Sequence, residues 1–505
     1  MTPEPPPAEP DVARRPAAAH DAPAALCSAR HGLAVPRGQG PIAGAVGGRF
    51  GRMFPSLPAC ELDDETIEAL VPCTKGRPTI NNRIPAGYTY FGQFVDHDIT
   101  FDPQSSLERA NDPHALTNFR TPRFDLDSLY GSGPADQPFL YDWHCRADPG
   151  VKLLHDHNPC DGEYAPLDLP RNAQGRALIG DARNDENLIV AQLHLLFVRF
   201  HNKVVDRVRD RHRQMTSSEV LAEAQRLVRW HYQWIVVHDF LERIVGRSAY
   251  QALRARADGV APAVARWLSA WRGEPFMPVE YSGAAYRFGH SMVNAQYTLN
   301  DGARGIPIFR PSGQDDDHLG GFRRLPANLV IEWDRFFFGP GSRGNPSSRI
   351  DQVLVAPLSR LPPDGAALTR LNLRRGRALG LPSGPDVARA MSIDPLTQDD
   401  LAPLQEGVPP EMDPTPFAAL QCHLKTLPLW LYILVDARFL GDSEGLSLGP
   451  VGGGIVSEVL LGLLEADPSS YLRQHPAWTP ELCDDGGGDF TMLDLVRYVE
   501  DPDWL

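Results

Sequence analysis

One stretch, residues 88–101 (Tyr-Thr-Tyr-Phe-Gly-Gln-Phe-Val-Asp-His-Asp-Ile-Thr-Phe), most constrains the fold because it sets polar groups among apolar and aromatic neighbours. Read as a helix, it places Gln93, Asp96 and His97 at i, i+3 and i+4, so an amide, a carboxylate and an imidazole share one face. A buried carboxylate or imidazole is costly unless something pairs with it. A lone helical histidine is more often a core or surface residue, but the whole set indicates a site with chemistry. Asp98 points to another side and is available to a second site.

Length and charge narrow the class of protein. The 505 residues are enough for about three average domains or for one large helical body. The formal net charge of -15 argues against nucleic acid or an anionic membrane as the main partner, because both attract clustered Lys and Arg. The seven cysteines form no C-x-x-C pair and are odd in number, which favours reduced thiols over a zinc ribbon or a disulfide scaffold.

We expect neither a signal peptide nor a membrane-spanning segment. Residues 1–48 are rich in Pro, Ala, Gly and Arg and lack the continuous apolar core of a signal peptide, so we predict a disordered leader. The apolar run at residues 427–435 is too short to span a bilayer and contains Pro428. We therefore expect one domain over residues 49–505, no membrane span, and a location in the cytoplasm or outside the cell by a non-classical route.

Hydrophobic periodicity predicts a mainly α protein with long irregular loops and little β structure. Residues 184–207 read as an unusually apolar helix through the middle of a large body. Residues 216–219 (Thr-Ser-Ser-Glu) form a capping box that opens a second long helix, which runs to about Val245 and stops at Gly246. Residues 412–475 are expected to be mostly helical. Residues 102–180 show little periodicity and predict a long ordered loop, of a kind that is usually functional or tied down by a ligand.

A second candidate site lies within that loop, at residues 120–132. Thr121, Asp125 and Asp127 alternate with backbone carbonyls in a pattern that can wrap a hard cation, and Asp98 is placed to complete the set. Calcium accepts six to eight oxygen ligands of these types. The spacing is not that of an EF-hand, and the alternative is an Asp-rich turn.

Four further positions are candidates for a buried site. Arg183 and Glu186 are neighbours on the first turn of the apolar helix, where the alternative is a salt bridge at a helix start. His290 follows Gly289 and suits an axial metal ligand, the alternative being a core histidine. Asn372 is placed to accept the second ring N–H of a metal-bound histidine, which would fix its tautomer.

Five motifs, taken in order, resemble those of the animal-type haem peroxidases, the superfamily of myeloperoxidase, lactoperoxidase and the cyclooxygenases. They occupy residues 92–98, 121–132, 180–186, 286–290 and 371–377, and the resemblance covers about residues 80–470. The chain is most similar to bacterial members. The resemblance implies a single large helical haem-peroxidase body that holds haem b and Ca2+.

The resemblance also implies a role for each matching residue. On the distal side of the haem, it implies that His97 is the base, Arg183 its partner and Gln93 a contact to peroxide or a small anion. On the proximal side, it implies that His290 ligates the iron and is bonded to Asn372, that Arg287 and Arg375 contact the haem propionates, and that Asp96 and Glu186 form ester links to haem methyl groups. The implied calcium ligands are Asp98, Thr121, Arg123 through its carbonyl, Asp125 and Asp127. Asn187 stands where myeloperoxidase has Met, so a sulfonium link is not expected. Residues 377–383 depart from the family pattern beyond Asn372, which leaves that part of the proximal network open.

The function implied is a peroxidase that uses the distal His and Arg to reduce hydrogen peroxide, forming compound I, and then oxidises a small donor such as halide, thiocyanate or phenol. A role in the response to oxidative stress follows from that activity. One alternative is a fatty-acid dioxygenase of the same superfamily. Cyclooxygenases carry their radical tyrosine three residues before the proximal histidine, where this chain has Arg287, with Tyr286 one step away. The other alternative is a haem- and calcium-binding protein without turnover, which would need neither His97 nor Arg183. The oligomeric state is left open.

Overall fold

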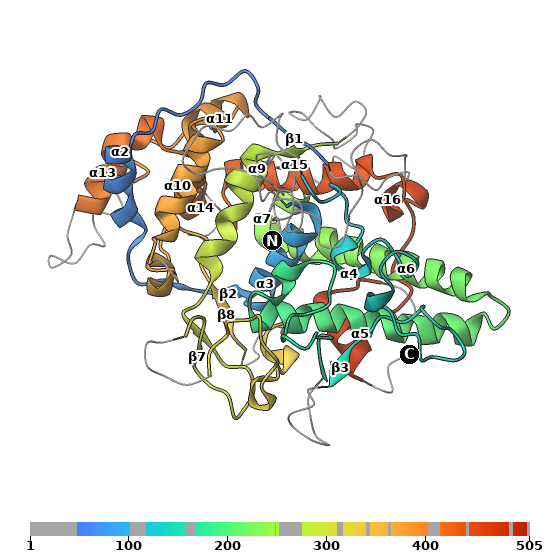
Figure 1. Cartoon of the computed structure of the whole chain (residues 1–505). Helices are drawn as coiled ribbons and strands as arrows, with labels where there is room; N and C mark the ends of the chain where they lie inside the picture. Colours follow the sequence, from blue (N-terminus) through green and yellow to red (C-terminus); the bar gives the residue numbers. More distant parts are fainter. Residues whose placement is uncertain are drawn as a thin grey trace, which may run out of the picture.

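The structure is a computed structural model that describes residues 48–101, 118–157, 167–247, 249–251, 275–310, 317–339, 344–361, 365–401, 415–440, 444–483 and 488–501. The fold is mainly helical, as predicted, with long irregular connections and very short strands (Figure 1). The predicted leader lies outside the described residues, except for Gly48.

The helices have the following bounds: α2 (Asp64–Leu70), η1 (Val71–Thr74), α3 (Gly87–Ile99), α4 (Asp127–Tyr130), η3 (Pro138–Leu140), η5 (Ala182–Asp185), α5 (Leu188–Arg211), α6 (Ser217–Ile235), η6 (Val236–Leu241), α7 (Glu242–Val245), α9 (Val279–Gly283), η8 (Ala285–Met292), η9 (Ala327–Leu329), η10 (Trp333–Arg335), η11 (Ala356–Ser359), α10 (Leu368–Ala378), α11 (Gly384–Ala390), α13 (Thr415–His423), η12 (Leu424–Thr426), α14 (Leu429–Phe439), α15 (Pro450–Ala466), α16 (Tyr471–Gln474) and α17 (Met492–Glu500).

The strands of the described residues form four small two-stranded sheets. Strand β1 (Phe50–Gly51) pairs in parallel with β5 (Met277–Pro278). Three pairs are antiparallel: β2 (Ile80–Pro85) with β8 (Pro346–Ser348), β3 (Asp156–His157) with β4 (Leu167–Asp168), and β6 (Gln296–Tyr297) with β7 (Ile306–Pro307). Their shortness confirms that helix packing, not a sheet, forms the core.

Helix α5 packs against both α3 and α6, and α5 and α6 run side by side (Figure 1). Aromatic rings from all three interlock: Phe94 of α3 stacks on Phe197 of α5 at 4.8 Å between centroids, and Tyr232 of α6 meets Phe197 edge-on at 5.8 Å. Such pairs stabilise a core beyond the area they bury. Helix α3, which carries the predicted catalytic face, is thereby fixed to the two longest helices.

The start of the apolar helix differs from the prediction of residue 184. Residues Ala182–Asp185 form a 3-10 turn, and α5 begins at Leu188. Asn187 is the N-cap, and its side chain accepts a hydrogen bond from the N–H of Val190 at 2.9 Å. An N-cap residue has extended backbone, so the chain must bend here before α5 can start. Arg183 and Glu186 therefore lie on a separate turn ahead of the helix.

The second long helix follows the prediction at both ends. Thr216 and Glu219 form the predicted capping box, and the helical path through α6, η6 and α7 stops at Gly246, whose φ is 83°. A φ in this region favours glycine. A π-helical segment, η6, interrupts the path, which the sequence did not indicate.

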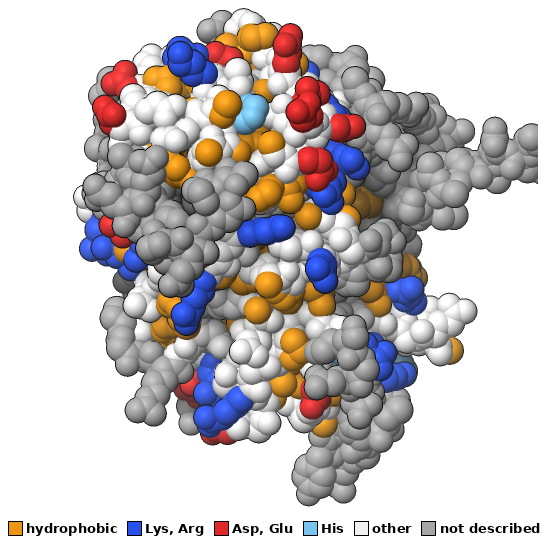
Figure 2. Space-filling model, turned by 90° about the vertical axis from the view of Figure 1, so that its left-hand side faces the viewer, with side chains coloured by type: hydrophobic (Ala, Val, Ile, Leu, Met, Phe, Trp, Pro, Cys, Tyr) orange, Lys and Arg blue, Asp and Glu red, His pale blue; other side chains and the backbone are white. Residues whose placement is uncertain are grey.

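Helix α5 is long and apolar enough to cross a bilayer by length and composition, but 83% of its most apolar window is buried inside the protein. It therefore has the burial of a core helix. The five cysteines in the described ranges, which exclude Cys27 and Cys160, are free thiols. On the face drawn in Figure 2, Lys and Arg side chains are scattered between exposed hydrophobic ones.

Candidate active site

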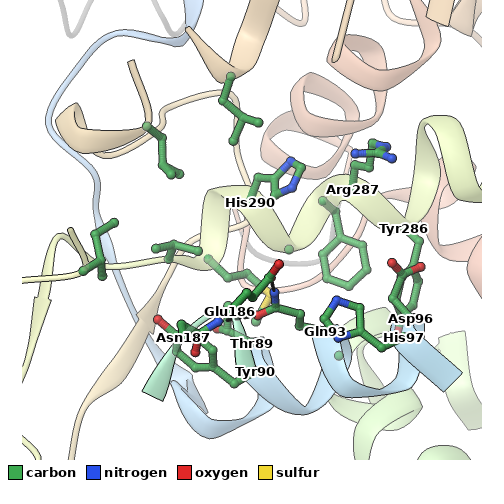
Figure 3. A pocket seen from close by; sticks show the side chains of 18 of the residues that line it. Thr89, Tyr90, Gln93, Asp96, His97, Glu186, Asn187, Tyr286, Arg287 and His290 are labelled. Carbon is green, nitrogen blue, oxygen red and sulfur yellow. Dashed lines mark hydrogen bonds between the residues drawn. The ribbon is translucent and has the colours of Figure 1, made fainter. Parts of the chain in front are cut away.

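A cavity of about 580 Å³ lies between α3 and η8, within the size range of small-molecule and cofactor sites. His290 lies on one side of it, and His97 and Asp96 lie on the other, where α3 runs (Figure 3). Gln93 and Glu186 also face the cavity. Residues almost 200 positions apart in the sequence are thus brought to one space.

His97 is held from behind by an amide. Its Nδ1 lies 2.8 Å from the side-chain oxygen of Asn184, so Nδ1–H donates and the lone pair is left on Nε2. Burial and the nearby charge of Arg183 lower the pKa of His97 from 6.5 to about 3. The imidazole is therefore neutral at physiological pH, which is the form a general base requires.

His290 is the second imidazole of the cavity. Burial lowers its pKa from 6.5 to about 3, so this ring is also neutral. The amide nitrogen of Asn372 lies 3.2 Å from its Nδ1, whereas the sequence predicted that the amide oxygen would accept there. A half-turn of the amide exchanges the two atoms, and ligation of a metal through Nε2 would require that exchange. Gly289 lines the cavity beside His290, and a Cβ at this position would meet no atom of the described residues within 4 Å.

Two carboxyl groups face the same cavity. Burial raises the pKa of Asp96, although Arg183 and Arg287 partly offset it, and the Asp96 side chain accepts a hydrogen bond from Thr100 at 2.9 Å. Burial also raises the pKa of Glu186, to about 7, and its carboxyl group accepts a hydrogen bond from the amide of Gln93. Asn187 donates to the other end of the Gln93 amide at 3.3 Å.

Arg183, the predicted partner of His97, lies against the main chain at the end of α3. Its Nη2 donates to the backbone carbonyls of His97 at 2.9 Å and Thr100 at 2.7 Å and pairs with Asp181 at 2.7 Å. The guanidinium thus caps the C-terminal end of α3, where the helix dipole favours a cation. It touches His97 through the main chain rather than through the imidazole. Asp181, two residues earlier, holds it there.

Asp181 is the centre of a buried ion-pair network. It is fully buried and pairs with both Arg183 and Arg120, the latter at 2.5 Å. Burial opposes ionisation, but the two guanidinium groups outweigh it and hold the pKa of Asp181 well below its usual range. Arg120 also pairs with Asp127 at 3.1 Å. The network therefore runs from residues 121–127, which we call the acidic loop, to the end of α3.

A second, smaller cavity of about 180 Å³ adjoins the first and shares Asp96 and Arg287 with it. Arg183 and Arg375 also line this smaller cavity, so together with Arg287 it has three guanidinium groups. This donor set suits anionic groups such as carboxylates.

The predicted calcium residues come together. One carboxylate oxygen from each of Asp98, Asp125 and Asp127 lies within 4.8 Å of the others. Thr121 donates to Asp125 at 2.7 Å, and Arg123 lies in the same turn. Asp98 Oδ1 is buried, and no group of the described residues forms a hydrogen bond to it. Burial followed by the neighbouring acids raises the pKa of Asp98 well above its usual range, and that of Asp127 rises to about 7. An oxygen cluster of this kind fits a hard cation.

Sequence reasoning missed four residues around the site. They are Arg120, Asp181, Asn184 and His194, all fully buried or nearly so. Asp181 and Asn184 flank Arg183 within the motif at residues 180–186, so the polar composition of that motif was the available signal. His194 gave no signal beyond being, with Gln192, one of two polar residues in the apolar run at residues 188–198.

A family model described as animal haem peroxidase matches residues 106–411, more than half of the chain. The chain belongs to the animal haem peroxidase family. The match starts after α3, so Gln93, Asp96, His97 and Asp98 lie outside the matched residues. The resemblance seen in the sequence motifs covers a longer stretch, from about residue 80 to residue 470.

Relatives within this family are distant. Thyroid peroxidase of Sus scrofa is 23% identical over 433 residues, which cover 77% of this chain and 43% of that protein. Chorion peroxidase of Drosophila melanogaster is 25% identical over 334 residues, which cover 62% of this chain and 38% of that protein. The chain thus spans less than half the length of these curated relatives.

Solved structures share the fold. Peroxidase A from Dictyostelium discoideum superposes with a TM-score of 0.60 at 14% identity, covering 90% of this chain and 94% of that one. A fatty acid alpha-dioxygenase from Oryza sativa superposes with a TM-score of 0.58 at 15% identity, covering 90% of this chain and 79% of that one. The fold is therefore common to a peroxidase and a dioxygenase, and the site must separate the two.

Proposed function

We propose that this chain is a haem peroxidase that reduces hydrogen peroxide and oxidises a small donor such as halide, thiocyanate or phenol. The observation that carries the proposal is that two neutral imidazoles, His97 and His290, face one cavity from opposite sides. Family membership supports haem as the cofactor and peroxide as the substrate.

The residues of the cavity fit haem. His290 would ligate the iron through Nε2, with Asn372 on its Nδ1, and Gly289 leaves open space beside it. Arg287 and Arg375 would bind the propionates in the smaller cavity. When bound, the haem iron supplies the two-electron reduction of peroxide.

The chain itself supplies proton transfer and charge. As the general base, the neutral imidazole of His97 would accept a proton from peroxide and return it to the departing oxygen. Arg183 adds fixed positive charge near the distal side, acting from the end of α3. The amide of Gln93 faces the same space and would contact bound peroxide or a small anion.

Two structural features would hold the cofactor and the site in place. Asp96 and Glu186 face the cavity, and we propose that one or both form ester links to haem methyl groups. Asn187 cannot form a sulfonium link because it lacks sulfur. We also propose Ca2+ at Asp98, Thr121, Asp125 and Asp127, with the carbonyl of Arg123 as a further ligand. The buried, unpartnered oxygen of Asp98 supports a cation there.

Spectra of the purified, haem-loaded protein test the proposal. Hydrogen peroxide should change the haem spectrum in proportion to the amount added, and a peroxidase donor, bromide or guaiacol, should restore it. A spectrum that peroxide leaves unchanged would contradict the proposal.

One observation favours a second candidate, a fatty-acid dioxygenase. Tyr286 lines the cavity, and its buried hydroxyl has no hydrogen-bond partner among the described residues. The cavity also has a lining of aliphatic side chains that includes Leu319, Leu358 and Leu361. Oxygen uptake with linoleate, absent from the Tyr286→Phe variant, would favour this activity over the peroxidase.

The bacterial origin, the domain boundary at residue 48 and the location in the cell remain predictions of the sequence.

A further inference from the structure

An amide links two buried histidines behind the cavity. The side-chain oxygen of Asn184 lies 2.8 Å from His97 Nδ1, and its nitrogen lies 3.0 Å from His194 Nδ1. Asn184 is fully buried, and His97 and His194 are 5% and 1% exposed. Neither imidazole can exchange this partner for bulk water, so the bridge is enforced by burial.

The orientation of that amide decides which nitrogen of His97 carries the proton. With the oxygen toward His97, Nδ1–H donates and the Nε2 lone pair faces the cavity. With the amide turned over, its NH2 group would donate to Nδ1, and the proton of a neutral His97 would sit on Nε2. Only the first arrangement leaves a base in the cavity. His194 favours it when its own Nδ1 lone pair accepts from the Asn184 NH2 group.

We propose that Asn184, supported by His194, is a positioning residue that sets the tautomer of His97. The inference rests on the proposed function for its importance, since a base is needed only if peroxide must lose a proton. The three elements suit this role, because Asn184 lies on the turn η5, His194 on α5 and His97 on α3, and these pack against one another. Groups behind a functional histidine commonly change activity by about 10–100-fold.

Two pairs of variants separate positioning from simple structural support. Asn184→Asp keeps an acceptor for His97 Nδ1–H, and Asn184→Ala removes it. His194→Gln can still accept from the Asn184 amide, and His194→Leu cannot. Asn202→Ala is the matched control. Asn202 lies on the same helix α5, bonds to the backbone of Leu153 at 2.7 and 2.9 Å, and does not face the cavity.

The first readout is the exchangeable Nδ1–H proton of His97, followed by NMR in the ferrous, carbon monoxide-bound, haem-loaded protein and assigned by its loss in His97→Ala. The second is the rate constant for reaction with hydrogen peroxide. We expect Asn184→Ala to lose the proton signal and to react about 10–100-fold more slowly. Asn184→Asp should keep the signal and stay within about 10-fold of the native rate, since its acceptor is retained. The control variant Asn202→Ala should keep both the native proton signal and the native rate constant.

Retention of the signal and the rate by Asn184→Ala would overturn the proposal. If Asn184→Ala takes up no haem, the His194 pair decides: loss of the signal in His194→Leu but not in His194→Gln supports the proposal, and equal behaviour overturns it. A native protein that shows the signal but does not react with peroxide would refute the proposed function and leave the inference intact.

Discussion

At the scale of single residues, the site depends on keeping two imidazoles neutral while carboxyl groups crowd the same cavity. Burial lowers the pKa of both His97 and His290 to about 3 and raises that of Glu186 to about 7. Neutral imidazoles can act as base and as metal ligand, and a carboxyl group with a raised pKa is less costly to bury.

Among the described residues that line the larger cavity, His97 is the only histidine on the α3 side, and His97→Ala removes its imidazole. The variant should still bind haem, because His290 is untouched, but it should react with hydrogen peroxide about 10²–10⁴-fold more slowly. Stopped-flow spectra at equal haem content measure this. An unchanged rate would show that His97 is not the base.

If Asp96 or Glu186 forms an ester link to haem, the haem should stay attached to the denatured protein. Acidified organic solvent should leave pigment on the native polypeptide. The double variant Asp96→Asn, Glu186→Gln should release all of it, because Asn187 offers no third link. Complete extraction from the native protein would remove the ester proposal.

Individual residues were predictable where a motif fixes their chemistry and not where tertiary contacts fix their direction. Asp96, His97 and His290 face the cavity that the motifs imply. The direction of the Arg183 side chain depends on Asp181 and on two carbonyls at the end of α3. A sequence does not show which of the available acceptors a guanidinium will bind.

At the scale of elements, the acidic loop is tied to α3 and α6. Asp98 belongs to α3, and α6 holds the loop through Arg229, which donates to the carbonyl of Asp125 at 2.6 Å. Cation binding to the three acids would therefore fix the loop against both helices.

Calcium should raise the melting temperature, and more strongly at pH 8 than at pH 5.5. Burial and the neighbouring acids raise the pKa of Asp127 to about 7, partly offset by Arg120, so below that pH a cation must displace a proton. Thermal unfolding with Ca2+ and with chelator measures the difference. Asp125→Asn should reduce the rise in melting temperature that Ca2+ causes. Asp136→Asn, which removes the same charge at an exposed position of the same segment, should not reduce it. Equal increments at both pH values would contradict the proposed cation site.

Element boundaries were predictable where local chemistry decides them. The capping box at Thr216 and the glycine at 246 set the ends of one helical path as expected. The start of α5 was placed four residues too early, because residues 184–187 have no residue that forbids helix and the N-cap role of Asn187 appears only once the chain bends.

At the scale of the whole molecule, the core encloses neutral histidines remote from the cavity. His201 on α5 bonds to the hydroxyl of Tyr130 at 3.1 Å and to the carbonyl of Val151 at 3.0 Å. Burial lowers its pKa from 6.5 to about 4. The unfolded chain therefore binds a proton below pH 6.5 that the folded chain does not, and His201 stabilises the fold less as the pH falls.

Comparison with His201→Gln isolates this effect from the buried carboxyl groups, which titrate in both proteins. The free energy of unfolding of the native protein should exceed that of the variant by an amount that shrinks between pH 6.5 and pH 4. The limiting slope is about 1.4 kcal/mol per pH unit. Urea unfolding at several pH values measures the gap, and a constant gap would contradict a neutral buried His201.

The central claim is that His290 and His97 face opposite sides of one haem, with His290 as the iron ligand. Resonance Raman spectroscopy of the ferrous, haem-loaded protein tests it most directly through the iron–histidine stretching band. The band should be present in the native protein and in His97→Ala and absent from His290→Ala. A band that survives in His290→Ala, or that disappears in His97→Ala, would contradict the claim.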